Sequence, residues 1–280
     1  MDKKLIDLFI KNAIAEDLGD GDHTSLSTIP SGAQGKAKLI VKEDGLLAGV
    51  ELAVAIFNQI DPTLQTTVFI QDGAAVKYGD IAFTVSGSSH SILLAERLVL
   101  NCMQRMSGIA TKTNHIVGLL KPYQTSLLDT RKTTPGMRYL EKWAVRIGGG
   151  VNHRIGLYDM ILIKDNHVDY AGGISQAITA ANHYLADKGK KLDIEIEVRN
   201  IEELNLVLAT GQVNRIMLDN FSFPDLREAV ALINHQYITE ASGGITEDNI
   251  AEYAACGVDY ISMGALTHSV KSLDMSLKAY

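Results

Sequence analysis

Six short apolar segments in the second half of the chain constrain its fold more than any other feature. They are "SLLDT" (126–130), "MILIKDN" (160–166), "DIEIEV" (193–198), "RIMLDN" (215–220), "YITEAS" (237–242) and "YISMGA" (260–265). Each has the length and composition of a buried strand, and stretches with a helical pattern lie between them. Strands that alternate with helices form parallel sheets, because a parallel connection has to cross back over one face of the sheet. The pattern therefore predicts βα units in a barrel or a doubly wound sheet.

The first half of the chain has a different pattern of predicted secondary structure. Residues 33–90 are typical of strands separated by turns such as Asp44-Gly45 and Asp72-Gly73, with one helical segment, "VELAVAIFNQI", between them. A long and mostly apolar helical pattern follows over about 91–120, and Pro122 stands just past its end.

One face of this long helix is not apolar. Arg97, Asn101, Gln104 and Gly108 follow one another at helical spacing and share one side of it. A polar or small stripe on an apolar helix needs a polar neighbour. That neighbour is either solvent at the edge of the molecule or, as the sharper hypothesis, a subunit interface or the wall of a site.

Two further helices are predicted from local signals. The N-terminal segment has apolar residues at positions 5, 6, 9, 10 and 13, which suits an amphipathic helix, and its charges exclude a signal peptide. After the first of the six strands, Thr134 is a candidate N-cap and Pro135 suits the first helical position. The glycines at 148–150 end this helix.

The composition is that of an ordinary globular protein, with 46% hydrophobic and 21% charged residues among 280. A net charge of −7 argues against a general nucleic-acid binder but leaves room for a local cationic pocket. The two cysteines, Cys102 and Cys256, have no metal-type spacing, so we expect reduced thiols in the core of a cytoplasmic protein. No run approaches the roughly 18 apolar residues of a membrane span.

Polar residues and glycines fall at or just past the carboxyl end of each predicted strand. In chain order they are Arg131 and Lys132; Lys164, Asp165, Asn166 and His167; Glu195 and Glu197; Asp219 and Asn220; Ser242, Gly243 and Gly244; and Gly264, Thr267 and His268. Taken singly, Asp219 is explained as a helix cap and Lys164 as a surface residue. Six strands in succession are better explained by a barrel, in which these ends meet at one mouth.

Positive charge concentrates between Thr130 and Lys164. Seven cations stand there against two acids, and Arg131, Lys132, Lys164 and the pair His153-Arg154 lie on predicted loops or strand ends. Such a group would repel itself unless a ligand with several negative charges filled the pocket. The sequence therefore predicts a multiply anionic ligand.

The last two strands lead into glycine turns, "ASGG" and "MGALTHS", each before a predicted helix. Glycine lets backbone N–H groups approach an anion, and a phosphate site after the last two strands recurs in barrels. The acids Glu197 and Asp219 would hold Mg²⁺ on a phosphorylated substrate or stabilise a developing positive charge. The constellation fits transfer of a phosphorylated sugar to an anionic acceptor.

The residues that carry these features resemble a known family. "AERLVLNCMQRMSGIAT", "DTRKTTPGMR", "GGGVNHRIGLYDMILIKDNH", "IEIEV", "IMLDN", "EASGGIT" and "GVDYISMGALTHS" are similar to quinolinate phosphoribosyltransferases (decarboxylating), also called nicotinate-nucleotide pyrophosphorylases. The resemblance implies an α/β fold, an incomplete, about six-stranded α/β barrel preceded by an N-terminal α/β sandwich domain. Residues 1–110, joined by the C-terminal tail 270–280, would form the sandwich, and residues 111–269 the barrel.

The resemblance also implies a reaction and a site. The phosphoribosyl group of phosphoribosyl diphosphate would pass to quinolinate with decarboxylation, giving nicotinate mononucleotide, CO2 and diphosphate, as a step of NAD biosynthesis with Mg²⁺. The implied substrate-binding residues are Arg97, Thr130, Arg131, Lys132, His153, Arg154, Lys164, Glu197, Asp219, Ser242, Gly243, Gly244, Met263, Gly264, Ala265 and His268. Among them Lys132, Lys164, Glu197 and Asp219 would be catalytic. Glu197 and Asp219 would contact Mg²⁺, partly through the diphosphate.

A homodimer, with a higher oligomer left open, follows from the same resemblance, and Arg97 would complete the site of the neighbouring subunit. One residue departs from the family pattern: Arg199 follows Glu197 at strand spacing, so it either neutralises that acid or lies beyond the mouth. Two alternative functions stay open. One is a pyrophosphorylase of the same fold with another anionic base, and the other is a barrel that binds phosphorylated ligands without catalysis.

Overall fold

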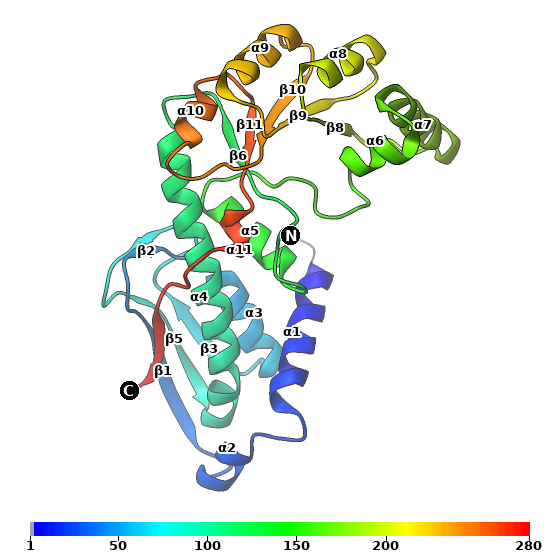
Figure 1. Cartoon of the computed structure of the whole chain (residues 1–280). Helices are drawn as coiled ribbons and strands as arrows, with labels where there is room; N and C mark the ends of the chain where they lie inside the picture. The colour runs from blue at the N-terminus through cyan, green and yellow to red at the C-terminus, as the bar shows by residue number, and fades with distance from the viewer. Residues whose placement is uncertain (1–2) are drawn as a thin grey trace. The chain divides into compact units, whose positions relative to one another are not determined.

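The computed structural model describes residues 3–280 and divides into two compact units (Figure 1). The first unit contains residues up to 114 together with 134–149 and 269–280, and the second contains 115–133 and 150–268. The segment 134–149, which the sequence division assigned to the barrel domain, therefore groups with the first unit.

The first unit is built on an antiparallel sheet with strand order β12-β1-β5-β3. Its strands are β1 (Gln34–Val41), β3 (Gln65–Val68), β5 (Ile81–Ser88) and β12 (Met275–Ala279), and β2 (Gly45–Leu46) pairs separately with β4 (Ala75–Val76). Its helices are α1 (Lys3–Leu18), α2 (His23–Thr28), α3 (Val50–Ile60), most of α4 (Ser89–Leu120) and α5 (Arg138–Ile147). In its core Phe57 of α3 meets Phe83 of β5 edge to face, with ring centroids 5.8 Å apart.

The polar stripe of α4 faces the chain's own C-terminal segment along half of its length. Gln104 donates from Nε2 to the Met275 carbonyl over 3.0 Å, and the Leu273 N–H donates to the Gln104 carbonyl over 3.0 Å. Gly108 lies directly against the Lys271 carbonyl. Arg97, further along the stripe, is exposed in this unit. The polar neighbour of Gln104 and Gly108 is therefore neither solvent nor a ligand site but backbone of the same unit.

The helix after the first barrel strand begins later than predicted. Its first residue is Arg138 and its N-cap is Met137, so the prediction of Thr134 as cap and Pro135 as first helical residue is wrong. Gly136 has a φ of +79°, which a right-handed helix cannot contain, so residues 134–137 form a turn instead. The predicted end is right, because Gly148 is the C-cap.

The second unit contains a six-stranded, fully parallel sheet of order β6-β11-β10-β9-β8-β7. Its strands are β6 (Ser126–Leu128), β7 (Ile161–Ile163), β8 (Ile194–Val198), β9 (Arg215–Asp219), β10 (Ile238–Ser242) and β11 (Tyr260–Ser262). Its helices are α6 (Asp165–Ala171), α7 (Ile174–Lys188), α8 (Ile201–Thr210), α9 (Phe223–Ile233), α10 (Ile250–Ala254) and α11 (Ala265–His268). All six predicted strands are confirmed. Within the described residues β6 and β7 do not pair with each other, so the barrel is incomplete, as expected.

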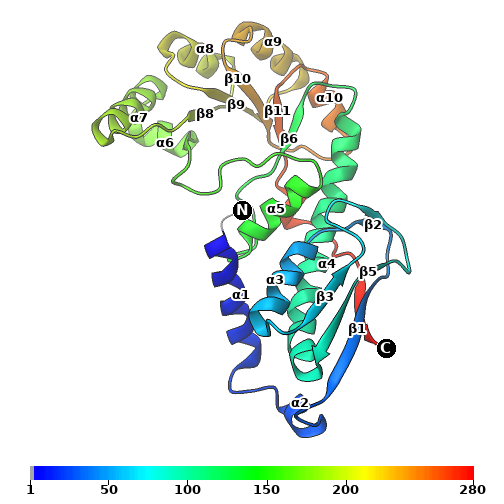
Figure 2. The same ribbon diagram turned by 180° about the vertical axis from the view of Figure 1, so that it is seen from behind.

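Alternation along these strands separates an apolar face from a polar one. Ile196 of β8 and Ile216 and Leu218 of β9 are buried, and each contributes roughly 1.5–3 kcal/mol through its burial. The helices lie along this outer side of the sheet (Figures 1 and 2). Glu195 pairs in register with Arg215, and Ser242 pairs with Asp219. The opposite face of the sheet therefore carries the polar side chains.

Three smaller predictions also have outcomes. The N-terminal amphipathic helix is present as α1, and Cys102 and Cys256 are buried and free, as predicted. Within residues 3–280, none of the helices combines the length and apolar character needed to cross a membrane.

The contact between α4 and the C-terminal segment can be tested with one methyl group. A Cβ at Gly108 would collide with the Lys271 carbonyl, whereas a Cβ at Gly118, in the same helix, would meet no atom within 4 Å. We expect Gly108→Ala to lower the free energy of unfolding by about 1–3 kcal/mol, because neither backbone segment can move aside freely. Gly118→Ala should raise it by about 0.5–1 kcal/mol through helix propensity. Urea unfolding measures both, and equal effects would contradict the close contact.

Candidate active site

The carboxyl ends of the parallel strands gather the predicted site residues at one edge of the sheet. Lys164 follows β7, Glu197 lies near the end of β8, Asp219 ends β9 and Ser242 ends β10. Because all six strands run in the same direction, these ends share one mouth.

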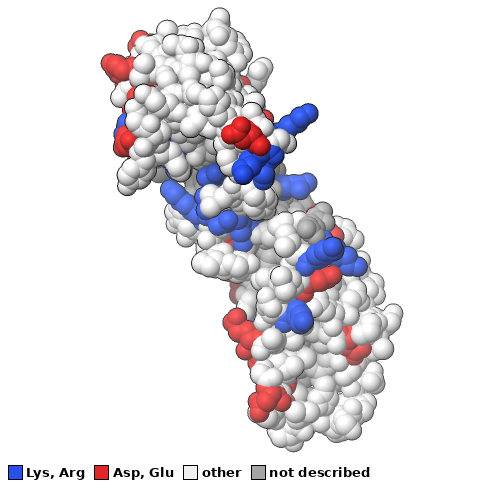
Figure 3. Space-filling model, turned by 90° about the vertical axis from the view of Figure 1, so that its right-hand side faces the viewer, with Lys and Arg blue, Asp and Glu red and all other residues white. Residues whose placement is uncertain are grey.

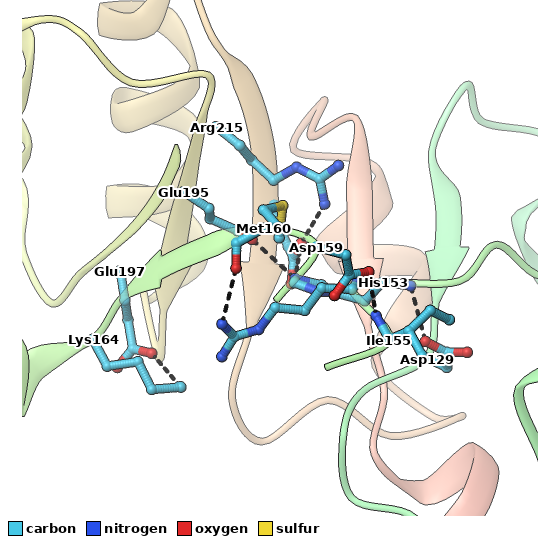
Figure 4. Close-up of polar contacts among 11 residues, drawn as sticks. Asp129, His153, Ile155, Asp159, Met160, Lys164, Glu195, Glu197 and Arg215 are labelled. Atoms are coloured by element: carbon cyan, nitrogen blue, oxygen red, sulfur yellow. Dashed lines mark hydrogen bonds and ion pairs between the residues drawn. The ribbon is translucent and has the colours of Figure 1, made fainter. Parts of the chain in front are cut away.

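Lys164 and Glu197 form an ion pair at this mouth. The Lys164 ammonium lies 2.7 Å from Oε2 of Glu197, whose side chain is only 9% exposed (Figure 4). A nearly buried carboxylate needs such a partner, because an unpaired buried charge is costly. The pair joins two of the four predicted catalytic residues.

Arg199 does not neutralise Glu197. Its guanidinium binds Glu203, with Nη2 at 2.6 Å and Nε at 2.8 Å from Oε1, and lies 3.6 Å from Asp169. Strand β8 ends at Val198, so strand alternation no longer governs the direction of Arg199. Of the two expectations for this residue, the position beyond the mouth is the right one.

Lys132, in the turn after β6, lies beside the second glycine turn, residues 263–265. The Lys132 N–H donates to Oγ1 of Thr130 over 3.0 Å, and buried Thr267 donates from Oγ1 to the Lys132 carbonyl over 2.8 Å. The space where a Cβ of Gly264 would lie is bordered by Cδ of Lys132 at 2.8 Å and by the His268 ring at 3.1 Å. A cation and an imidazole thus flank a glycine of the predicted phosphate turn. Met263 and Ala265, its other predicted members, adjoin Gly264.

The first glycine turn is linked to the acid of β9. Asn220 adopts a left-handed backbone with a φ of +56°, and its amide donates to Oδ2 of Asp219 over 2.7 Å. Its N–H donates to the Ser242 carbonyl over 2.8 Å, and its side chain lies against the position that a Cβ of Gly243 would occupy. Gly244 follows with a φ of +63°. The acid and the turn therefore form one interlocked unit.

His153 is buried and held from several sides. Its backbone N–H donates to Oδ1 of the buried Asp129 over 2.9 Å, and Asn152 donates to the other oxygen of Asp129 over 2.6 Å. The Arg154 N–H donates to Nδ1 of the His153 ring over 2.7 Å. Nε2 of the ring lies 2.9 Å from a carboxylate oxygen of Glu195.

Beneath the mouth, Glu195, Glu240 and Arg215 bring charge into the interior of the barrel. Nη1 of Arg215 lies 3.1 Å from Oε2 of Glu240, and the same oxygen lies 3.5 Å from Nε2 of His153. Both glutamate side chains are 0% exposed. Figure 4 shows the side chains of Glu195 and Arg215 directed toward His153, apart from the Lys164–Glu197 pair.

These contacts shift the acidity of the buried groups. Burial lowers the pKa of His153, but hydrogen bonding to Glu195 and Glu240 outweighs it and raises the pKa to about 9. Burial and the Glu240 charge raise the pKa of Glu195, whereas the hydrogen bond to His153 lowers the pKa of Glu240 against the effect of burial. The cluster therefore binds an additional proton readily.

Two arginines at the mouth influence one another electrostatically. Burial and then the charge of Arg131 lower the pKa of Arg154, which means that the two guanidinium groups repel one another. Arg154 also donates from Nη1 to the Met160 carbonyl over 3.2 Å. Figure 3 shows several Lys and Arg side chains exposed on one face of the molecule, with Asp and Glu side chains among them. An anion with more than one negative charge would relieve the repulsion.

Two groups of residues offer donors for a metal ion. His153, Glu195 and Glu240 have donor atoms within 4.8 Å of one another, but a buried site with a histidine suits Mg²⁺ poorly, because this ion prefers oxygen ligands and keeps several waters. Asp219 and Glu197 offer carboxylate oxygens at the mouth. Mg²⁺ is usually held by one or two carboxylates together with substrate phosphates, so this second pair fits the ion.

The sequence interpretation missed three residues of this region. Asp129, Arg215 and Glu240 received no role, although each is an ionisable residue within or at the end of an apolar strand segment. That position was the available signal, because a charged residue in a strand that is otherwise buried needs a specific partner. Arg97 lies on α4 and belongs to the first unit, not to the barrel unit.

Comparisons with known proteins agree with one another. The family model "Quinolinate phosphoribosyl transferase, C-terminal domain" matches residues 109–278, and the corresponding N-terminal domain model matches residues 22–107. A chloroplastic nicotinate-nucleotide pyrophosphorylase [carboxylating] of Arabidopsis thaliana is 48% identical over 96% of this chain and 81% of its own length. A probable nicotinate-nucleotide pyrophosphorylase [carboxylating] of Bacillus subtilis is 42% identical over 98% of this chain and 92% of its own length. The solved structure of the nicotinate-nucleotide pyrophosphorylase from Francisella tularensis is 40% identical, covers 100% of this chain and 98% of its own, and has a TM-score of 0.92.

The close contact between Asn220 and Gly243 in the first glycine turn, residues 242–244, gives a prediction with a matched control. Gly243 and Gly172 have almost the same φ, +90° and +88°, but a Cβ at Gly243 would collide with Asn220, whereas one at Gly172 would meet nothing within 4 Å. Both alanine variants should lose about 1–2 kcal/mol of unfolding free energy from the left-handed backbone. Gly243→Ala should lose about 1–3 kcal/mol more, because Asn220 has to move. Denaturant unfolding compares the two, and equal losses would show that Asn220 yields without cost.

Proposed function

Because the chain belongs to the quinolinate phosphoribosyltransferase family, we propose that it transfers the phosphoribosyl group of phosphoribosyl diphosphate to quinolinate, with loss of CO2 and diphosphate. The product is nicotinate mononucleotide, and the enzyme is a pentosyltransferase of NAD biosynthesis. The observation that carries this proposal is the mouth of the barrel. Arg131 and Arg154 repel one another there, and the Lys164–Glu197 pair and two glycine turns lie at the ends of the neighbouring strands.

The charges of the site residues suggest which part of each substrate they bind. Arg131, Arg154 and Lys164 are suited to the two carboxylates of quinolinate, because arginine binds carboxylates in a bidentate manner and lysine adds a compact charge. The turns at 242–244 and 263–265 present backbone to the phosphate end of the sugar. Lys132 lies against the second turn, where a cation stabilises a phosphate or the departing diphosphate.

The chemistry then needs little covalent help from the protein. The pyridine nitrogen attacks the anomeric carbon of the ribose as its bond to diphosphate breaks, so positive charge develops on the sugar and then on the ring. Glu197 and Asp219 would stabilise that charge. When CO2 departs, the electron pair of the broken bond stays on the ring carbon, where the adjacent cationic nitrogen stabilises it. A proton then replaces CO2 at that carbon. Bringing two anionic substrates together in one geometry supplies much of the acceleration.

Mg²⁺ is proposed as the cofactor. Asp219, with Glu197 beside it, would hold the ion together with oxygens of phosphoribosyl diphosphate, and the ion would neutralise charge on the departing diphosphate. A homodimer is proposed as well, in which Arg97 of one subunit approaches the site of the other. We propose the cytoplasm as its location, although the names of plant relatives place those proteins in chloroplasts or mitochondria.

The rival acceptor is another anionic base. Two arginines and a lysine suit a dicarboxylate better than a monocarboxylate, because one carboxylate would leave part of this charge unbalanced. Turnover of quinolinate and of nicotinate by the purified chain, each with phosphoribosyl diphosphate and Mg²⁺, separates the two. Preference for nicotinate would overturn the proposed substrate, and binding of both substrates without turnover would favour the non-catalytic barrel.

We predict that Arg154→Ala and Lys132→Ala each lower kcat/KM for quinolinate by about 10- to 150-fold, since a charged hydrogen bond contributes roughly 1.5–3 kcal/mol. Arg227→Ala and Lys188→Ala, which remove exposed cations from α9 and α7, should keep wild-type rates. Steady-state kinetics and circular dichroism check activity and folding together. Near-normal rates in the first two variants would contradict their placement in the site.

The shared site is tested by mixing inactive chains. In the proposed dimer each site takes Lys164 from one subunit and Arg97 from the other. A dimer of one Arg97→Ala chain and one Lys164→Ala chain would therefore contain one intact site. After subunit exchange, shown by mass spectrometry, the mixture should regain about a quarter of wild-type activity, the share expected for random pairing in a symmetric dimer. Exchange without recovery would count against an Arg97 that acts across subunits.

A further inference from the structure

The barrel contains a layer of buried charge to which the proposed chemistry gives no role. Glu195 of β8, Arg215 of β9 and Glu240 of β10 lie below the residues of the mouth, on the same face of the sheet as Glu197 and Asp219. Barrel interiors are ordinarily filled by branched apolar side chains. This layer therefore has to be explained by something other than packing.

Stability is a poor explanation for these residues. A buried ion pair contributes little to stability, because removing two charges from water costs about as much as their attraction returns. The layer is nonetheless specific in its geometry. Arg215 binds Glu240 over 3.1 Å and stacks on the Tyr260 ring, with its guanidinium carbon 4.7 Å from the ring centroid. The guanidinium is thus fixed from two directions, and it fixes Glu240 in turn.

The layer ends at His153. Glu195 and Glu240 approach Nε2 of its ring at 2.9 and 3.5 Å, while Nδ1 accepts the Arg154 N–H over 2.7 Å. The ring is 6% exposed, so its contacts lie almost wholly within the protein. Its rotation sets the position of the Arg154 amide, and Arg154 is one of the two arginines at the mouth. A chain of direct contacts therefore runs from Arg215 through Glu240 and His153 to Arg154.

We propose that Glu195, Glu240 and Arg215 are positioning residues, which hold the His153 ring and thereby keep Arg154 in the geometry that binds the anionic base. This inference rests on the proposed function for the identity of the base. The role is to place a charged group before the substrate arrives, so that binding requires no rearrangement of the arginine. It predicts a specific weakening of one substrate rather than a general loss of activity.

Glu240→Gln tests the proposal, because it keeps the shape of the side chain and removes the charge that faces Arg215 and His153. We expect KM for quinolinate to rise about 10- to 100-fold, the range for a displaced binding group, while KM for phosphoribosyl diphosphate changes less than about 2-fold. Arg215→Lys, which preserves the charge, should retain quinolinate binding better than Arg215→Met. A crystal structure of Glu240→Gln should show a rotated His153 ring and loss of the bond from the Arg154 amide.

Two further variants separate a loss of positioning from a loss of folding. The double variant Arg215→Met/Glu240→Gln removes both members of the pair, leaves no uncompensated charge between them, and should therefore fold. It should show the same rise in KM for quinolinate. Asp72→Asn weakens the hydrogen bonds that Asp72 accepts from the Val50 and Glu51 N–H groups at the start of α3, in the other unit, and should lower stability with both KM values unchanged.

The outcomes are distinguishable. If Glu240→Gln and the double variant fold and keep the wild-type KM for quinolinate, the positioning role is wrong. Lack of quinolinate turnover by the unmodified chain would instead overturn the proposed function, and the crystal structure would still report on His153. A divalent ion that copurifies in equal amount with the chain and is lost in Glu240→Gln would make the cluster a metal site and overturn the proposal.

Discussion

The parallel direction of the six barrel strands is the constraint on which the candidate site depends. Lys164, Glu197, Asp219 and Ser242 are far apart in sequence, and they meet because each ends or follows a strand that runs the same way. The period of two along a strand fixes which residues face the interior. A slip of one residue in β8 or β9 would turn Glu197 or Asp219 toward the outer helices and bring isoleucine or leucine to the mouth. The hydrophobic outer face therefore holds the register, and the register places the polar residues.

Charge is distributed unevenly within this frame. Lys164 and Glu197 neutralise one another, and the side-chain amide of Asn220 donates a hydrogen bond to Asp219. These contacts fix the orientation of both acidic side chains before a ligand binds. Arg131 and Arg154 are different, because the charge of Arg131 disfavours the charge of Arg154. Repulsion of this kind is a cost in the empty protein that an anion of matching charge removes. Under the proposed function, the mouth would select its ligand by the number and spacing of negative charges more than by hydrophobic contact.

Most of the fold could be predicted from the sequence, and the reasons for the failures are physical. The six strands were found because apolar runs of strand length are bounded by turn residues, and their parallel arrangement followed from the helices between them. The start of α5 was missed, because Thr134 and Pro135 suit a helix locally whereas the left-handed Gly136 interrupts it. Arg199 was placed on the face of Glu197 by an alternation that stops at Val198. Glu240 and Arg215 stand out as charged residues within apolar strands, but their pairing joins residues 25 positions apart, which no local pattern reveals.

The buried layer changes how a barrel of this kind can prepare a binding site. A loop arginine on its own is free to sample many rotamers, and fixing it on binding costs entropy. Here the backbone of Arg154 is held by a ring that is itself enclosed by two carboxylates from separate strands, and one of these is fixed by an arginine on a third. The desolvation free energy of these charges is offset during folding by burial of the hydrophobic core. It therefore does not weaken substrate binding. An apolar interior of the same volume would be easier to stabilise, but it would leave His153 without partners and the Arg154 amide without a fixed acceptor.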